Sequence, residues 1–270
     1  MSYATQPGAG GGAGTAGTGT TDSLVIPSRF CGPGGSGNGG YVCGRIAAYL
    51  HGPVTVTLRR PPPLEVPMTV ERDGEGTVRI HHGDTLIAEA AATPGSPAAT
   101  IPGPVSMTEA LAVAGRAHYY TDPAFPDCFV CGMNREPGDG LRIFPGPVPG
   151  RALWAAPWTP GTSVTGTGGR VRPEVIWAAL DCPSGIAAAE SAGLSQNTAI
   201  LLGRMTASLA ALPAPGDRCR VIAWPGPRDG RKLLAFGGLL GPGGDVLAAA
   251  SAVWLTVPRP VPALAAKETL

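Results

Sequence analysis

Asp181 is an acidic residue that could take part in catalysis. It ends a largely apolar helix predicted over residues 170–181, and Cys182 and Pro183 follow it. A carboxyl group in such surroundings can act as a general base on water or as a nucleophile, and burial raises its pKa. The competing interpretation is a helix-end Asp that satisfies backbone donors ahead of a break at Pro183.

Glu174 lies seven residues before Asp181, on nearly the same face of the predicted helix. The rise of an α-helix separates two such residues by about 10 Å, which is far for a carboxylate pair. Glu174 falls in the first turn after Pro173, so its favoured role is to interact with the helix dipole.

The turn Asn38-Gly39-Gly40-Tyr41 is a second candidate, because it opens a short helix predicted within residues 37–50. N–H groups at a helix start are preorganised to stabilise an oxyanion, and glycines let a substrate carbonyl approach the backbone. The alternative is a plain glycine-rich loop, since the turn belongs to the stretch CGPGGSGNGG.

Cys128 and Cys131 have the spacing of half a zinc site. The chain has no second CxxC or HxxxH, although His118, Cys182 or Cys219 could converge on the pair. The favoured interpretation is two small buried residues on a strand, so we predict no metal and no cofactor. A thioredoxin-like redox role would need a βαβ context that this region lacks.

Other nucleophilic side chains have weaker support. The segment DCPSG at 181–185 does not match the GxSxG elbow of serine hydrolases. Cys43 and Cys182 have no evident histidine partner, and we predict that both are buried thiols. His81 and His82 lie between a strand and a turn, where a surface position is favoured.

Two similar series of elements must position these residues. A helix within 37–50 precedes strands at 54–58, 67–71, 77–82 and 84–92, and the helix at 170–181 precedes strands at 198–209, 217–224, 232–240 and 245–257. One helix followed by antiparallel strands, present twice, indicates an internal duplication and an α+β fold. The 41 glycines and 30 prolines supply the turns between the strands.

The two series set the expected domain boundaries. We predict a disordered glycine-rich tail (1–22), a shorter first domain (23–93), a linker with a connecting helix (94–120), a second domain (121–258) and a C-terminal tail (259–270). The connecting helix is expected after Ser106, which forms a capping-box pattern with Glu109.

Composition excludes several classes of protein. The hydrophobic share is 43% and the net charge is +1, which is unlike a disordered chain or a nucleic-acid-binding surface. No apolar run is long enough to span a membrane, and no export signal opens the sequence. Six cysteines in 270 residues do not form a disulfide scaffold, so we expect reduced thiols and a cytoplasmic location.

The stretch CFVCGMNREPGDGLRIF, from residue 128 onward, resembles the opening of hotdog-fold acyl-CoA thioesterases. The resemblance covers roughly residues 30–257 and extends to double-hotdog proteins of actinobacteria. It implies two tandem hotdog domains, each an antiparallel sheet wrapped around a central helix, that form a pseudodimer.

The resemblance also implies one composite active site. In the family the central helix begins with a His-Gly-Gly turn and carries an acid nine residues later; Asp181 stands at the acid position counted from Arg172, whereas Asn38 leads to Ala47. Asn38, Gly39 and Gly40 of the first domain would thus face Asp181 of the second. The mirror site should be inactive, since Pro173 removes a backbone donor.

The function that follows is hydrolysis of an acyl thioester of coenzyme A or of acyl carrier protein. The acyl chain would pass Tyr41, Ile46, Trp177 and Ile186. Some larger acyl-CoA thioesterases use Thr and Gln to orient water, which would imply this accessory role for Gln196 and Thr198; the favoured interpretation is that both are polar loop residues. The alternatives are a dehydratase or hydratase, a non-catalytic acyl-CoA binding protein, and a scaffold. A monomer and a homodimer of pseudodimers both remain open.

Overall fold

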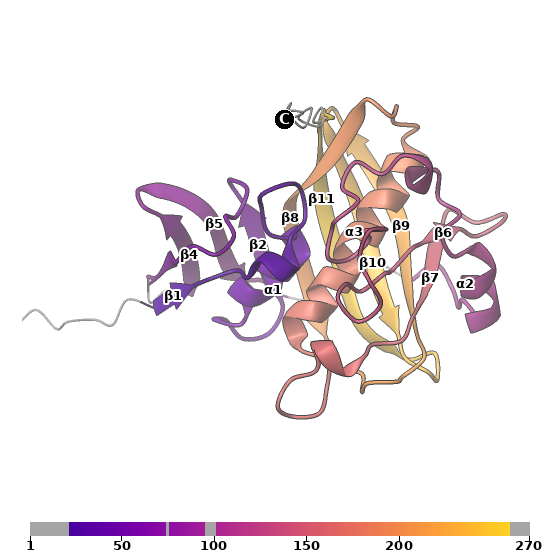
Figure 1. The fold of residues 1–270 in the computed structure, drawn as a ribbon, viewed down its shortest axis with the longest axis horizontal. Helices are drawn as coiled ribbons and strands as arrows, with labels where there is room; N and C mark the ends of the chain where they lie inside the picture. The colour runs from indigo at the N-terminus through magenta and orange to yellow at the C-terminus, as the bar shows by residue number, and fades with distance from the viewer. Residues whose placement is uncertain (1–21, 74–75, 95–100, 260–270) are drawn as a thin grey trace, which may run out of the picture.

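The computed structural model describes residues 22–73, 76–94 and 101–259 (Figure 1). The predicted N-terminal tail other than Asp22, part of the predicted linker and nearly all of the predicted C-terminal tail lie outside the described residues. Within the described part of the chain, no helix is both long enough and apolar enough to cross a membrane.

The helices and strands follow the order expected from the sequence. The α-helices are α1 (Gly39–Ala47), α2 (Met107–Val113) and α3 (Pro173–Ser191). The strands of the first half are β1 (Asp22–Leu24), β2 (Val54–Leu58), β3 (Met68–Arg72), β4 (Thr77–His82) and β5 (Thr85–Ala92). Those of the second half are β6 (Gly146–Pro147), β7 (Trp154–Trp158), β8 (Thr198–Leu209), β9 (Cys219–Asp229), β10 (Lys232–Leu240) and β11 (Val246–Pro258).

All of these strands belong to one antiparallel sheet, in the order β1-β3-β4-β5-β2-β8-β11-β10-β9-β7-β6. The two halves join edge to edge, because β2 pairs with β8 from Val54↔Ala207 to Thr57↔Arg204. Read outward from this junction, β2-β5-β4-β3-β1 and β8-β11-β10-β9-β7 have the same chain order. The strand order therefore repeats the duplication that the sequence suggests, within a single continuous sheet.

Helix α3 lies along the strands of the second half (Figure 1) and is longer than predicted. A break at Pro183 was predicted, but α3 continues through this residue to Ser191. An internal proline costs about 3 kcal/mol, so packing must hold the helix. That packing is close at the next turn, where a Cβ on Gly185 would lie 2.7 Å from the Trp254 ring, and Trp254 donates a hydrogen bond to Ser184.

Helix α1 packs against α3 next to the β2–β8 junction (Figure 1), and two glycines allow this close approach. A Cβ on Gly40 would lie 2.5 Å from Asp181 Cβ and 2.6 Å from the Trp177 carbonyl oxygen. A Cβ on Gly44 would lie 2.5 Å from Glu174 Cα. The start of α1 is thus fixed against the middle of α3, and its later turn against the start of α3.

The segment with Cys128 and Cys131 forms turns, so its predicted strand is wrong. The chain bends back on itself here, with the Gly132 N–H donating to the Cys128 carbonyl at 2.9 Å. The capping box of α2 is present as predicted, since the Ser106 side chain accepts from the Glu109 N–H and the Glu109 carboxylate accepts from the Ser106 N–H.

Candidate active site

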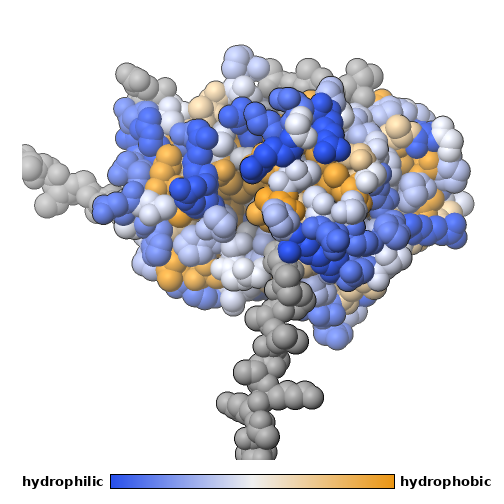
Figure 2. Space-filling model, turned by 90° about the horizontal axis from the view of Figure 1, so that it is seen from above, coloured by the Kyte–Doolittle hydropathy of each residue, from blue (hydrophilic) through white to orange (hydrophobic). Residues whose placement is uncertain are grey.

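A cavity of about 250 Å³ opens where α1, α3 and β8 meet. Asn38 and Gly39 border it from the first half, and Asp181 and Cys182 border it from the second. Much of the remaining wall is apolar and includes Phe125, Ile186, Ile200, Leu201, Leu202 and Trp254. On the outside of the molecule, seen from above in Figure 2, apolar patches alternate with polar groups.

Asp181 lies at the start of α1, although it belongs to α3. Its side chain is only 2% exposed, and its Oδ2 accepts hydrogen bonds from Asn38 Nδ2 and from the Gly40 N–H, both at 2.9 Å. Its Oδ1 is also buried and has no hydrogen-bond partner among the described residues. One carboxylate oxygen is therefore held in place, and the other keeps its capacity to accept a hydrogen bond.

Burial raises the pKa of Asp181 from 3.8 to about 7. The hydrogen bonds from Gly40 and Asn38 favour the carboxylate and oppose this shift, whereas negative charge on Cys128 adds to it. A carboxyl group with a pKa near neutrality is suited to accept a proton in general base catalysis.

Asn38 connects the two helices through both atoms of its side-chain amide. Its Oδ1 caps α1 by accepting from the Tyr41 N–H at 2.9 Å, and its Nδ2 donates to Asp181. Gly39 lines the cavity, and its N–H makes no hydrogen bond to any residue that the structure describes. Oxyanion binding was predicted for the whole turn, but the Gly40 and Tyr41 N–H groups already donate to side chains, which leaves the Gly39 N–H for this role.

The remaining aromatic and apolar candidates separate into core and cavity. The Tyr41 ring is 1% exposed and stacks on Phe30 with a centroid distance of 3.9 Å, so it belongs to the core. Ile46 and Trp177 are also buried away from the cavity, whereas Ile186 lines it. An acyl chain in this cavity would contact Ile186 and not the other three.

The accessory candidates also separate. Gln196 and Thr198 both line the cavity, and Gln196 Nε2 lies 2.8 Å from the Nε2 of His118. Glu174 lies outside the cavity lining and forms an ion pair with Arg172 at 3.7 Å. The structure thus brings Gln196 and Thr198, but not Glu174, to the cavity that Asp181 borders.

Three arginines on the cavity wall were not singled out from the sequence. Arg59 pairs with Glu89, and Arg259 forms two 2.8 Å contacts with Asp122. Arg60, the third, forms no ion pair among the described residues. The adjacent Arg59 and Arg60 form a basic pair in the sequence that could have indicated an anion-binding site. Arg259 is distant in the sequence and reaches the cavity only through the tertiary fold.

Three thiols also border the cavity: Cys128 and Cys131 are buried as predicted, whereas Cys182, which was predicted to be buried, is only partly buried. The sulfur atoms of Cys128, Cys131 and Cys182 lie within 4.8 Å of one another, and Cys128 and Cys182 are 3.5 Å apart. Cys182 therefore does converge on the CxxC pair, whereas Cys219 lies buried on β9.

Comparison with solved structures defines the fold. The chain is similar to the tesB protein of Mycobacterium avium subsp. paratuberculosis (13% identity, TM-score 0.57), over 87% of this chain and 91% of that one. It is similar to acyl-CoA thioesterase II TesB2 of Mycobacterium marinum (14%, TM-score 0.57, 87% and 92%). A protein of Alicyclobacillus acidocaldarius described as having a hot dog fold matches with 13% identity and a TM-score of 0.50, over 88% and 93%.

These similarities show that the chain has the hotdog fold. No protein-family model matches the chain. No curated protein matches it significantly.

Proposed function

We propose that the chain consists of two tandem hotdog domains, over about residues 23–93 and 121–258, that pair as a pseudodimer. The repeated strand order on either side of the β2–β8 junction supports this division. Each half contributes one helix, α1 or α3, and the two helices pack against each other at the junction. The candidate site would then lie between the domains.

We propose that this site hydrolyses acyl thioesters. One observation carries the proposal: Asp181 of α3 is buried at the first turn of α1, beside a cavity whose wall is largely apolar. The free N–H of Gly39 borders the same cavity. A general base and an oxyanion donor from two halves of the chain therefore face one space that an acyl group can enter.

In the proposed reaction, Oδ1 of Asp181 takes a proton from a water molecule as the water oxygen bonds to the thioester carbonyl carbon. The Gly39 N–H and the positive end of the α1 dipole stabilise the negative charge on the carbonyl oxygen. The carbon–sulfur bond then breaks, and the leaving thiolate takes the proton from Asp181. The products are a carboxylic acid and the free thiol of the carrier.

The arginines support coenzyme A as the carrier. Its phosphate groups would meet Arg59, Arg60 and Arg259, and guanidinium groups bind phosphate oxygens well. Arg60 is the most available of the three, because it has no carboxylate partner among the described residues. The acyl chain would follow the apolar wall near Ile186.

A second candidate function is acyl-thioester binding without turnover. The contacts of Asp181 favour this function, because its carboxylate accepts from the Gly40 N–H and from the Asn38 amide. Among the backbone N–H groups of the turn, only that of Gly39 is then left to stabilise an oxyanion. A hydratase receives less support, because none of the histidines in the described residues lines the cavity.

A panel of acyl-CoA and acyl carrier protein thioesters of graded length, with detection of the released thiol, tests the proposal. We expect turnover of at least one thioester and a loss of about 10²- to 10⁴-fold in Asp181→Asn, because the general base is removed. Glu174→Gln, which changes a carboxyl group on the same helix, should keep wild-type turnover. Tight binding with no turnover would favour the second candidate, and equal turnover in Asp181→Asn would contradict the mechanism.

A further inference from the structure

Three thiols from two distant parts of the chain converge beside the cavity. Cys128 and Cys131 come from the turn segment before β6, and Cys182 comes from α3. Their sulfur atoms lie within 4.8 Å of one another, with 3.5 Å between those of Cys128 and Cys182. The thiols are not needed for the proposed hydrolysis, so their convergence requires a separate explanation.

The turn that carries Cys128 and Cys131 is tightly closed. The Gly132 N–H donates to the Cys128 carbonyl oxygen at 2.9 Å. Gly132 closes the turn, and a Cβ there would lie 2.4 Å from the Cys128 carbonyl oxygen, so a side chain does not fit. The tight turn therefore fixes the backbone between the two cysteines, whose sulfur atoms lie within 4.8 Å of each other and of Cys182 Sγ.

Polar groups also surround the sulfur cluster. Asn38 Nδ2 lies 3.8 Å from Cys128 Sγ and 3.7 Å from Cys182 Sγ. Tyr119 lines the same cavity as the three thiols. Donors of this kind orient ligand atoms and tune the metal in known metal sites.

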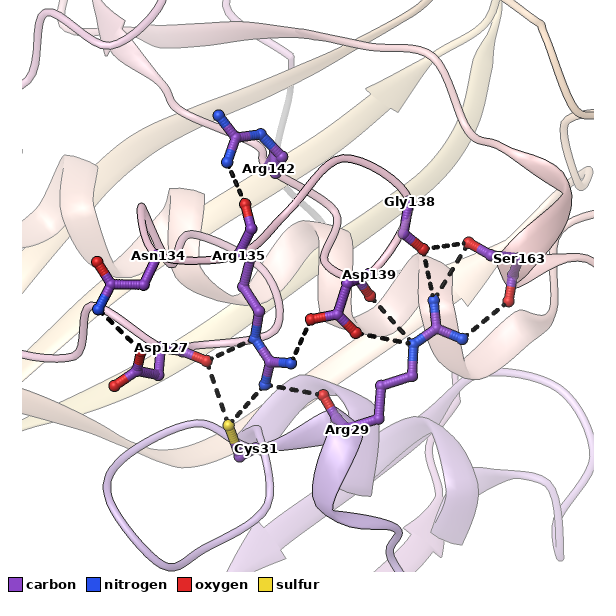
Figure 3. A network of polar contacts seen from close by, with 9 residues as sticks. All are labelled: Arg29, Cys31, Asp127, Asn134, Arg135, Gly138, Asp139, Arg142 and Ser163. Atoms are coloured by element: carbon purple, nitrogen blue, oxygen red, sulfur yellow. Dashed lines mark hydrogen bonds and ion pairs between the residues drawn. The ribbon is translucent and has the colours of Figure 1, made fainter.

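A network of arginine contacts holds the CxxC segment in place (Figure 3). Arg135 donates to the Asp127 carbonyl at 2.8 Å, to Asp139 at 2.7 Å and to the Arg29 carbonyl at 3.0 Å. Arg29 in turn donates to the Gly138 carbonyl at 2.9 Å. The segment is therefore tied to the first half of the chain, which fixes where its two sulfur atoms lie.

We propose that Cys128, Cys131 and Cys182 bind one Zn²⁺ ion through their sulfur atoms, with the fourth coordination position toward the cavity. Zn²⁺ accepts thiolate ligands at about 2.3 Å in tetrahedral geometry, which places the sulfur atoms about 3.8 Å apart. The Cys128 and Cys182 sulfur atoms are 3.5 Å apart, and the other two separations are at most 4.8 Å, so a small adjustment brings all three to this value. All three cysteines border the cavity, so a water molecule or a ligand can take the fourth position.

The metal content of the protein tests this inference without any assay of turnover. A failure of the zinc proposal can therefore be told apart from a failure of the proposed hydrolysis. The full chain is purified without a metal-binding tag, under reducing conditions, and its zinc is quantified by mass spectrometry. We expect about one zinc per chain. Exchange for Co²⁺ should produce a sulfur-to-cobalt charge-transfer band and the visible bands of tetrahedral cobalt.

Variants then assign the ligands. Cys131→Ser should abolish the charge-transfer band or weaken it strongly, because it removes one of the three proposed thiolate ligands. Cys219→Ala is the matched control, because Cys219 is a buried cysteine outside the cluster, and it should bind cobalt as the wild type does.

Three results would overturn the inference. They are wild-type protein that takes up neither Zn²⁺ nor Co²⁺, a disulfide between any two of the three cysteines in protein isolated without reductant, and cobalt bands unchanged in Cys131→Ser. If Cys131→Ser does not fold, the wild-type cobalt titration decides alone, because its charge-transfer intensity reports the number of thiolate ligands.

Discussion

The two ends of the α1–α3 pair are built on one plan but differ in chemistry. At one end, the start of α1 meets Asp181 of α3; at the other, the start of α3 meets Gly44 of α1. The first end has a capped helix start, a buried carboxyl group and a cavity. At the second end Arg172 makes no side-chain cap, Pro173 has no N–H to donate, and Glu174 is only partly buried.

This difference shows that two helices can pack closely through a glycine without forming a candidate active site there. Gly40 and Gly44 serve the same packing purpose at the two ends. Only the Gly40 N–H also donates to a carboxylate, whereas Glu174 beside Gly44 pairs with Arg172 at its own end of α3. The two helices thus pack closely at both ends of the pair, while only one end carries the candidate site.

The largest expected effect is on the pH dependence of stability, measured in chelator-treated protein. Because the pKa of Asp181 is raised from 3.8 to about 7, the folded chain holds a proton in that range that the unfolded chain has lost. The free energy of unfolding therefore falls as the pH rises from about 4 to about 8, by roughly 4 kcal/mol at most. Asp181→Asn should be more stable than the wild type at the higher pH and equal to it at the lower.

Urea unfolding at both pH values measures this difference. The titratable groups that face Asp181 are the thiols of Cys43 and Cys128, and they are present in both proteins. Glu174→Gln is the control from the other end and should stay within about 0.5 kcal/mol of the wild type throughout. If the stability of Asp181→Asn changes with pH as that of the wild type does, the buried carboxyl group is not the cause of the pH dependence.

Alanine at either close-packing glycine is expected to have the next largest effect. Both Gly40→Ala and Gly44→Ala would place a Cβ within 2.6 Å of atoms of α3, including backbone atoms at each position. Each should lower the free energy of unfolding by about 3 kcal/mol. Gly34→Ala is the control, because a Cβ there meets nothing within 4 Å. If one of the two core variants unfolds like the wild type, the helices do not pack alike at both ends.

The smallest expected stability effect comes from the caps. Asn38→Ala removes the α1 cap and the amide that holds Asp181, so we expect a loss of about 1–2 kcal/mol in stability together with reduced turnover. Arg172→Ala, at the uncapped start of α3, should change turnover by less than about 2-fold. Thermal unfolding and thiol release on the same samples separate the two effects, and equal losses of turnover in both variants would contradict the assignment of the site to one end.

Local patterns predicted most of the fold, because alternating apolar residues and Gly/Pro turns act within a few residues of each other. The strands at 77–82 and 232–240 begin and end where their periodicity indicates. The length of α3 could not be predicted in this way, since packing around Gly185 and Trp254 outweighs the local cost of Pro183.

The site was predictable only in part. The spacing of residues in the family motif predicts that Asp181 faces Asn38, and in the structure Asn38 Nδ2 lies 2.9 Å from Asp181 Oδ2. The convergence of Cys182 with Cys128 and the position of Arg259 on the cavity wall depend on contacts between distant segments. No short-range pattern encodes such contacts.

The structure of a complex with a ketone analogue of acyl-CoA, in which a methylene group replaces the thioester sulfur, tests the central claim most directly. The account predicts that the ketone oxygen lies within about 3.2 Å of the Gly39 nitrogen, with the carbonyl carbon facing Asp181 and the phosphates near Arg60. A ketone bound beside Glu174 at the other end of the helix pair, or outside the cavity altogether, would contradict it.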